Sequence, residues 1–420
     1  MIKKLVIITI GIIGCSLGIK LIISHASIAF PISQQSSEVL SQGTEIMANE
    51  MVQAQAMFGF KLFNQLTQVQ ENKNVFISPS SIILALSMLY NGAEGETKQE
   101  IEQALEYQGM TLEAVNQANQ NLQQQLNQTT PDIQLAIANS LWLREGFSVE
   151  DKFLQNNQDF YQAEVAELDF DSPGSVKTMN QWVQDKTQGK IDRMIDRVSP
   201  NDMMFLINAI YFKGNWTEKF QESQTQNKVF YSIDGTEKQH PLMSRQDQFS
   251  YLETDDFQGI SLPYGEDQRF SLYVFLPKPD QSMNNFLQAL NMENWNQWMQ
   301  QFSIKKGKIE LPRFKLEYDI ELNQVLQKLG MTSSFNPSQA DFSKLSQSED
   351  LFVSVVKHKT FLEVNEEGTE AAASTAIGMR TTSIEPNPFY MIVNRPFFCA
   401  IRDNQTGIIL FMGVIYNLEN

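Results

Sequence analysis

The sequence predicts an α+β fold with large, mainly antiparallel sheets. Three observations lead to this class: apolar residues recur at helical spacing in the first part of the chain, alternating or continuous apolar runs dominate the later part, and few helical patterns separate those runs. Helices followed by many strands, without regular alternation of the two, are typical of α+β proteins. Because no change of composition divides residues 45–420, we predict that they form a single domain.

Local signals place four helices near the start of that domain. Apolar residues three or four positions apart mark the first, and Ser78-Pro79 starts the second, since serine caps a helix and proline fits its first turn. The second helix ends at Asn91-Gly92, and the fourth is polar and rich in glutamine. The predicted helices cover residues 47–66, 78–92, 97–105 and 111–126.

The later apolar runs predict strands. Residues 203–212 are almost continuously apolar, as in a central strand that is buried on both faces. Asp234-Gly235 is a turn signal between the two strands of a hairpin. The predicted strands cover residues 133–137, 203–212, 229–242 (the hairpin), 270–276, 308–316, 352–364, 389–393, 397–402 and 408–416.

The first 29 residues differ from the rest and predict an export segment. Lys3 and Lys4 precede an uncharged run over residues 5–19, and small residues follow up to Ala29. A positive start, an apolar core and a small-residue end are typical of a secretory signal peptide. We therefore expect residues 1–29 to be removed on export and residues 30–44 to be a polar linker.

Two alternatives for this segment stay open. Residues 5–23 are nearly long enough to span a bilayer as an uncleaved anchor, and Cys15 lies in a sequence that resembles a bacterial lipoprotein box. Each alternative still places the domain outside the cytoplasm. We expect a secreted, extracellular or periplasmic protein that is attached to a membrane only if this segment is uncleaved or lipidated.

The composition argues against most enzymes and against nucleic-acid binding. The net charge of −17 repels nucleic acid and anionic membranes, which need a positive field. The chain has three histidines and two cysteines, too few for a Cys/His zinc module or a disulfide framework. These residues are His25, His240, His358, Cys15 and Cys399. We expect a solvated hairpin turn for His240 and the core for His358 and Cys399, and predict no catalytic residue, metal or cofactor.

Residues 366–378 form the most unusual segment of the sequence. Residues 371–379 contain no charge, proline or aromatic ring. A flexible linker or a short alanine-rich helix would also have this composition. In a strand, however, Glu370 would face one side only, and the opposite side could be buried between other strands. The segment can therefore be a loop and can also become a central strand.

That segment closely resembles the hinge of the reactive-centre loop of inhibitory serpins, and further motifs match the same family. Residues 74–93 and 180–191 resemble its second and sixth helices, residues 208–216 resemble strand 3 of its main sheet, and residues 394–413 resemble its C-terminal signature. The resemblance covers nearly all of the chain after residue 45 and is closest to an exported member of prokaryotic type. It implies three β-sheets, eight or nine helices and an exposed reactive-centre loop.

The resemblance implies that the protein is not an enzyme but a suicide substrate of a serine protease. The protease cleaves the loop and forms an acyl-enzyme, and the freed N-terminal arm enters the main sheet as a new strand, which distorts the protease. The small uncharged residues of the arm favour insertion and hence inhibition. The alternative is a non-inhibitory serpin-fold binding or storage protein. A monomer without a cofactor is expected.

The resemblance also assigns roles to individual residues. The hinge comprises Glu366, Glu367, Gly368, Thr369, Glu370, Ala371, Ala372 and Ala373. The shutter, a network under the point where strands 3 and 5 of the main sheet part, comprises Ser78, Asn208 and His358. The breach, at the top of that sheet, comprises Trp216, Arg313 and Glu366. We expect an Arg313–Glu366 ion pair that restrains opening of the sheet.

The cleaved bond decides which protease is trapped. In the family the hinge glycine is the fifteenth residue before that bond, so Gly368 selects Thr382–Ser383. Threonine is small and β-branched and suits an elastase-like or subtilisin-like pocket. The rival is Arg380–Thr381, because a trypsin-like pocket with a buried carboxylate binds a guanidinium. Cleavage there would shorten the inserting arm by two residues.

Some members of the family are activated by heparin-like polysaccharides through a basic fourth helix. This chain has no lysine or arginine from residue 99 to residue 143. A polyanion needs a positive surface, so we expect no activation of that kind through the fourth helix. The expected partner is the target protease alone, without nucleic acid.

Overall fold

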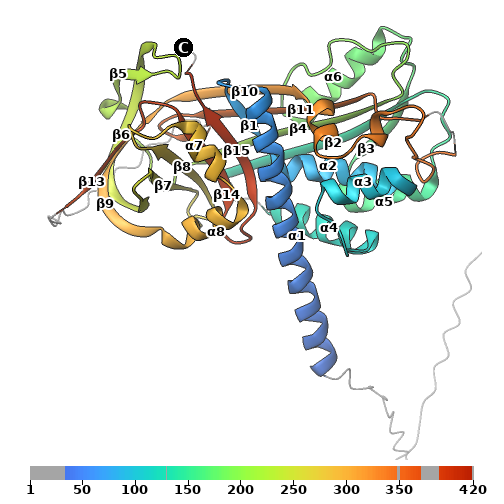
Figure 1. Ribbon diagram of the computed structural model, residues 1–420, viewed down its shortest axis with the longest axis horizontal. Coiled ribbons are helices and arrows are strands. Elements are labelled where there is room, and N and C mark those ends of the chain that lie inside the picture. The colour runs from blue at the N-terminus through green and yellow to red at the C-terminus, as the bar shows by residue number, and fades with distance from the viewer. Residues whose placement is uncertain (1–33, 129, 348–350, 370–386, 419–420) are drawn as a thin grey trace, which may run out of the picture. The chain divides into compact units, whose positions relative to one another are not determined.

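A computed structural model describes the chain from the start of its first helix (Figure 1). The described residues are 34–128, 130–347, 351–369 and 387–418, with backbone only for residues 34–49. Residues 46–420 make up one compact unit, and the residues up to Glu45 make up a second unit. Within the described part of the chain, no helix combines the length and the apolar character needed to cross a membrane.

Nine α-helices lie in the described residues. They are α1 (Gln34–Val69), α2 (Pro79–Gly92), α3 (Gly95–Ala104), α4 (Leu112–Leu126), α5 (Asp151–Tyr161), α6 (Gly174–Lys186), α7 (Met283–Ala289), α8 (Met292–Gln301) and α9 (Asn323–Lys328). The side chain of Ser78 caps α2 by accepting a hydrogen bond from the Ser81 amide, as the sequence predicts. Helix α1 begins at Gln34 and not near residue 47, so it includes most of the predicted polar linker, whose glutamines, serines and glutamate are compatible with a helix.

The strands form a six-stranded and a nine-stranded sheet. The six-stranded sheet has the order β10 (Phe314–Glu321), β11 (Val355–Val364), β12 (Gly368–Thr369), β4 (Met204–Asn215), β2 (Ile133–Arg144) and β3 (Glu164–Leu168). The nine-stranded sheet has the order β1 (Val75–Ile77), β15 (Ile409–Ile415), β14 (Phe397–Asp403), β8 (Phe270–Pro277), β7 (Phe257–Tyr264), β6 (Glu237–Glu253), β9 (Ser303–Pro312) and β13 (Phe389–Ile392), and β5 (Gln226–Tyr231) pairs with β6. The predicted α+β class is confirmed.

The family resemblance predicts three sheets, whereas the described strands form two. The difference arises from strand β6, which joins two of the predicted sheets by hydrogen bonds. It is 17 residues long, and it pairs with β9 over Leu242–Tyr251 and with β7 over Ser250–Glu253. One continuous strand therefore belongs to both groups. Conversely, the predicted strand 308–316 is divided at Arg313, because β9 ends at Pro312 and β10 starts in the other sheet.

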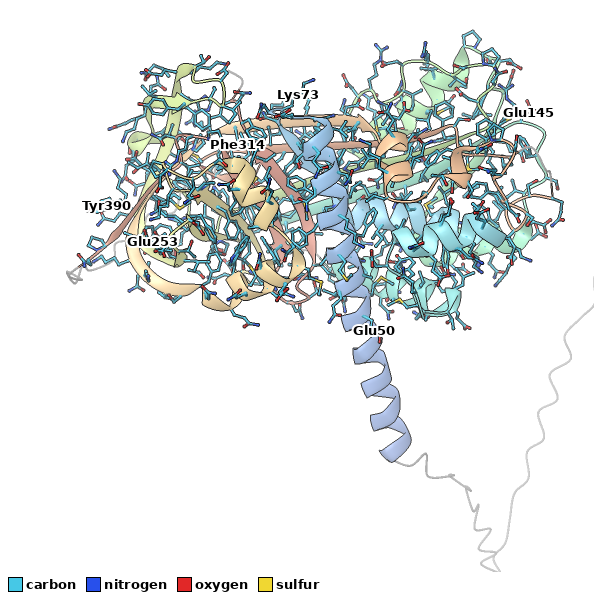
Figure 2. The ribbon with its side chains drawn as sticks, in the orientation of Figure 1. Glu50, Lys73, Glu145, Glu253, Phe314 and Tyr390 are labelled. Carbon is cyan, nitrogen blue, oxygen red and sulfur yellow. The ribbon has the colours of Figure 1, made fainter. Side chains whose placement is uncertain are left out.

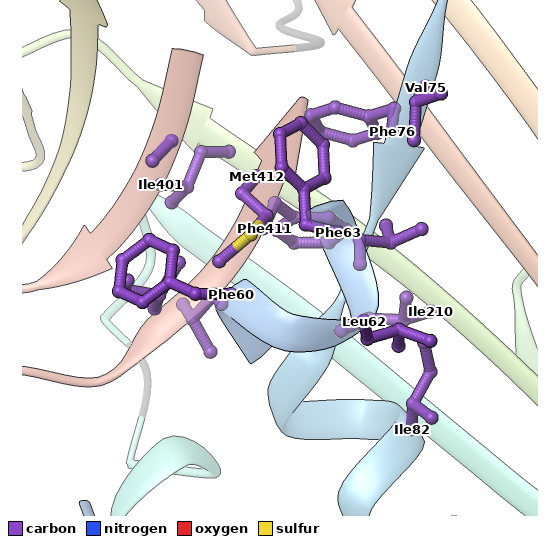
Figure 3. Packing of buried hydrophobic residues seen from close by; sticks show 14 of the residues in the cluster. Phe60, Leu62, Phe63, Val75, Phe76, Ile82, Ile210, Ile401, Phe411 and Met412 are labelled. Carbon is purple, nitrogen blue, oxygen red and sulfur yellow. The ribbon is translucent and has the colours of Figure 1, made fainter. Parts of the chain in front are cut away.

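The main core fills the space between helices α1 and α2 and the sheets. Figure 3 shows Phe60 and Phe63 of α1 beside Phe411 and Met412 of β15. The ring of Phe76 in β1 stacks on that of Phe411, with centroids 5.3 Å apart. This cluster covers one face of the six-stranded sheet.

A second cluster covers the other face of the same sheet. It packs Met179 and Val183 of α6 against Ile207 and Tyr211 of β4, and α6 and α2–α5 lie on opposite sides of β4 and β2 (Figure 1). The strap, which we define as residues 187–203, completes this layer. Strand β4 is therefore buried on both faces, which explains its continuous apolar sequence.

Candidate functional site

The site lies where β4 and β11 part. The two strands are parallel neighbours from the pair Val355–Phe205 to the pair Phe361–Tyr211. Beyond that point β12 lies between them, antiparallel to both: Gly368 pairs with Asn215, and Thr369 pairs with Gly214 and Val364. The first two residues after the turn are thus already a strand of this sheet.

A tight turn over residues 365–368 reverses the chain into the sheet. The amide of Asn365 donates to the carbonyl of Gly368 at 2.9 Å, and the side-chain oxygen of Asn365 accepts from the Glu367 amide at 3.0 Å. Gly368 has a φ of +149°, and a β-carbon there would lie 2.1 Å from the carbonyl oxygen of Gly214. Only glycine fits such a close approach of two backbones.

Thr369 is fully buried and anchors the inserted dipeptide. Its hydroxyl lies 2.6 Å from the phenol oxygen of Tyr264 in β7. Burial raises the pKa of Tyr264 well above its usual range, so the phenol stays protonated. The Tyr264 ring stacks on Trp216 with centroids 4.4 Å apart, so the anchor is itself held by an aromatic pair.

The breach residues hold the turn from outside. The expected ion pair is present: an Arg313 Nη atom lies 2.6 Å from Oε1 of Glu366, whose side chain is 4% exposed. The hydroxyl of Thr225 donates to the same oxygen. The indole of Trp216 donates to the carbonyl of Asn365 at 2.8 Å. Glu367, on the other side of the turn, forms an ion pair with Lys219.

Reversing the charge of Arg313 should loosen this turn. In Arg313→Glu the buried carboxylate of Glu366 would lose its cation and gain a repelling neighbour. Since Arg313 itself is half-exposed, we expect a loss of about 1–2 kcal/mol. Spontaneous conversion to latent or polymeric forms on mild heating, followed on native gels, should be roughly tenfold faster. Lys344→Glu, in an exposed pair with Glu94, is the control; equal rates for both variants would remove the restraining role of Arg313.

The predicted shutter residues come together beneath the β4–β11 pairing. Nδ1 of His358 lies 2.6 Å from Oδ1 of Asn208, its direct partner across the two strands. Nε2 accepts from the backbone amide of Ser78 at 3.1 Å. The amide nitrogen of Asn208 donates to the carbonyl of Ser81 at 3.1 Å and to the side chain of Asn139 in β2. The network joins three strands to the start of α2.

Two features of the shutter were not foreseen from the sequence. Ser78 contributes its backbone amide, because its hydroxyl caps α2. Ser81 and Asn139 are additional members. Ser81 lies in the same motif as Ser78, and Asn139 follows the alternating run at residues 133–137. A polar residue within an otherwise apolar helix or strand was the sequence signal that could have indicated these two members.

The strap bridges this part of the sheet on its outer side. Oδ1 of Asn180 accepts from the amides of Met194 and Ile195 at 2.8 and 2.9 Å. Nζ of Lys359, in β11, donates to the carbonyl of Arg193 at 2.8 Å. Because Lys359 is a buried residue next to His358, this bond ties β11 to the strap directly above the shutter.

Acid should weaken the fold through His358. Burial lowers the pKa of His358 to about 3, whereas an unfolded histidine titrates near 6.5. The unfolded chain therefore binds the extra proton first, and the free energy of unfolding falls as pH falls from about 6.5 towards 3. The free energy of unfolding, measured with urea, should fall between pH 6.5 and 5 in both proteins. The fall should be smaller in His358→Gln than in wild type, by up to about 2 kcal/mol. His240→Gln is the control, and an unchanged decline in His358→Gln would contradict the assignment.

Two other expectations concern residues outside the shutter. Cys399 is buried and unpaired, as predicted. His240 is not in a solvated turn: it is buried in β6, and Nε2 contacts the carbonyl of Arg313. The hairpin turn ends before Glu237, where β6 begins, so His240 already lies inside a paired strand.

Several predicted positions lie outside the described residues. They are the later hinge residues Glu370, Ala371, Ala372 and Ala373, and the cleavage candidates Arg380, Thr381, Thr382 and Ser383. The predicted export segment, residues 1–29, also lies outside them. Sequence reasoning missed Tyr264, Thr225 and Asn365 as partners of the hinge and breach.

Comparisons with known proteins agree with this geometry. The family profile "Serpin (serine protease inhibitor)" matches residues 53–418. The human leukocyte elastase inhibitor is 34% identical, over 87% of this chain and 98% of its own length. The structure of tengpin, a thermophilic serpin, in the native state has a TM-score of 0.82 at 33% identity and covers 87% of this chain and 94% of tengpin. Human thyroxine-binding globulin complexed with thyroxine has a TM-score of 0.82 at 28% identity, with coverages of 89% and 100%. The chain belongs to the serpin family.

Proposed function

We propose that the protein inhibits a serine protease as a suicide substrate, by inserting its cleaved loop between β4 and β11. The observation that carries this proposal is β12, which already occupies the first two positions of the new strand. Each further residue of the arm would extend an existing antiparallel ladder. Such strand addition is a known mode of recognition and of strain release.

The energetics favour complete insertion once the loop is cut. Insertion would replace one parallel ladder, between β4 and β11, by two antiparallel ladders, one on each side of the arm. Each net backbone hydrogen bond contributes about 1 kcal/mol. The barrier includes the His358–Asn208 bond and the covering strap, which span the gap that must open. The protein is therefore held in a metastable state by kinetics.

The proposed target is an elastase-like or subtilisin-like protease that cleaves Thr382–Ser383. The small side chain of threonine supports this, and one relative is named a leukocyte elastase inhibitor. Cleavage at Arg380–Thr381 by a trypsin-like protease is the rival. A non-inhibitory binding role is the second candidate, because thyroxine-binding globulin shares the fold.

We also propose that the inhibitor acts outside the cytoplasm as a monomer without a cofactor. The charged start and apolar core within residues 3–29 support export. Helix α4, rich in glutamine and without lysine or arginine, offers no basic surface to heparin. Mass spectrometry of the protein recovered from its producing cells would separate a cleaved signal from an anchor or a lipid at Cys15.

Mixing experiments test the inhibitory function. The purified protein is incubated with elastase, subtilisin and trypsin in turn, and with at least one of them we expect an SDS-stable band whose mass is the sum of both proteins minus the released C-terminal fragment. Mass spectrometry of the released C-terminal fragment identifies the cleaved bond, because the fragment begins at Ser383 after cleavage of Thr382–Ser383 and at Thr381 after cleavage of Arg380–Thr381. Clean cleavage by every protease, without a stable complex and without a rise in melting temperature, would overturn the proposal in favour of a non-inhibitory role.

A further inference from the structure

The outward side chains of β9 and β13 form a surface that the proposed insertion does not use. We call it the β9–β13 face and define it as Ile304, Lys306, Lys308, Tyr390 and Ile392. The parallel register pairs Tyr390 with Lys308, so these side chains point the same way. The alternate residues Phe389 and Met391 of β13 are buried against the core.

Three of the five side chains that define this face are large and apolar. Ile304 is 69% exposed and Tyr390 is 65% exposed, the two highest values among large apolar side chains in the described part of the chain. Ile392 is also exposed. Tyr390 lies at the outer edge of the molecule on β13 (Figure 2). Tyr390 and Ile392 are successive outward positions of β13, and Ile304 lies four residues before Lys308 on β9, with Lys306 between them. Single exposed apolar residues are ordinary, whereas a strip of three beside two lysines offers a partner both apolar and charged contacts.

A positively charged hollow adjoins these side chains. It has a volume of about 340 Å³ and is lined by Lys228, Lys308, Gln246 and Glu310. Two ammonium groups surround one carboxylate: Nζ of Lys228 lies 2.6 Å and Nζ of Lys308 2.8 Å from oxygens of the buried Glu310. Burial alone would raise the pKa of Glu310, but the two lysines outweigh it and lower the pKa. The trio carries a net charge of +1, in a chain of net charge −17.

The position of the face relative to the loop points to its occupant. Phe389 is seven residues after Thr382, so an extended chain between them spans at most roughly 25 Å. A globular protease of about 220 residues is roughly 40 Å across. A protease bound at the proposed bond is therefore wide enough to reach β13. Protease–inhibitor interfaces bury about 800 Å² of each partner, so an interface of this size can extend from the loop to the neighbouring β13.

We propose that the β9–β13 face is a second docking surface for the target protease. The partner that fits is a serine protease with carboxylates and an apolar patch on the rim beside its active-site cleft. The apolar side chains would pack on that patch, and the lysine-lined hollow would take a carboxylate. This inference rests on the proposed inhibitory function. Complementary charge beside the loop raises the association rate and leaves the fate of the acyl-enzyme unchanged.

The test separates docking from trapping. For each protease that wild type traps, the association rate constant and the stoichiometry of inhibition are measured for the double variant Ile304→Ser/Tyr390→Ser. We expect association to be about tenfold slower with at least one protease, at unchanged stoichiometry. Lys308→Gln should flatten the salt dependence of that rate. Leu154→Ser, an exposed apolar change in α5, is the matched control and should leave both quantities unchanged.

The two possible failures are distinguishable. If wild type forms stable complexes but the double variant associates as fast as Leu154→Ser with every trapped protease, the docking surface is refuted and the inhibitory function stands. If wild type traps no protease of the panel, the inhibitory function fails and the docking surface fails with it. A changed stoichiometry at an unchanged association rate would also overturn the docking role, because it would place the effect on insertion.

Discussion

Replacing Thr369 with arginine is expected to turn the protein from an inhibitor into a substrate. Thr369 is fully buried between β4 and β11 and hydrogen-bonds to Tyr264. A guanidinium there would lose its hydration without a carboxylate partner, at a cost of several kcal/mol. The dipeptide would then be expelled from the sheet, so the arm would have to start its strand anew and would insert more slowly than the acyl-enzyme hydrolyses. We expect the stoichiometry of inhibition to rise at least about tenfold, with cleavage of the loop still complete.

Two further variants serve as controls for Thr369→Arg. Thr369→Ser keeps a hydroxyl at the same place and should remain an inhibitor. Thr236→Arg makes the same substitution in the exposed hairpin turn before β6 and should also behave as wild type. An unchanged stoichiometry for Thr369→Arg would show that the pre-inserted dipeptide is not needed for trapping.

Removing the side chain of Asn208 should have the second large effect. The side-chain nitrogen of Asn208 donates to Ser81 and Asn139, and its Oδ1 accepts a hydrogen bond from Nδ1 of His358, all in a buried network. Asn208→Ala leaves several of these groups unpaired, and we expect a loss of about 2–4 kcal/mol. The melting midpoint should fall by roughly 5–10 °C. The same variant should convert spontaneously to latent or polymeric forms, because the side-chain link between β4 and β11 is lost and only the backbone pairing remains at this point.

A second buried asparagine separates lost stability from a lost restraint. Asn156 donates to Asn91 at 3.0 Å in the helical layer, away from the shutter. Asn156→Ala should also lower the melting midpoint. When each protein is held equally far below its own midpoint, however, Asn156→Ala should convert to latent or polymeric forms no faster than wild type. The gating role of Asn208 is wrong if the two variants convert at equal rates when compared in that way.

The sequence predicts local features of this fold well. Ser78 caps α2, the hairpin turns at residues 232–236, and the continuous apolar run of β4 is buried on both faces. Each of these depends on neighbouring residues or on a simple period. The family resemblance adds the shutter and breach residues, which the structure brings together, although their roles remain predictions.

Contacts between distant residues could not be predicted in the same way. Thr369 and Tyr264 are 105 positions apart, and a strand pattern shows which face a residue takes but not which side chain it meets. The same reason explains why Thr225 and Asn139 were missed, and why His240 was placed in solvent and not inside β6. Two of the predicted sheets are joined because β6 is 17 residues long. An alternating pattern indicates that a strand is present but defines poorly where it ends.

The inserted dipeptide at Gly368–Thr369 also has a kinetic consequence. Starting a new strand normally requires the chain ends to be brought together before any pairing compensates for the lost entropy. Here that nucleation has already taken place, since β12 is paired on both edges before any cleavage. Under the proposed mechanism only propagation would remain, and we expect its slowest step to be the parting of β11 from β4 and from the strap at Lys359. In that case the rate of trapping would be set in the middle of the sheet and not at the loop that the protease cleaves.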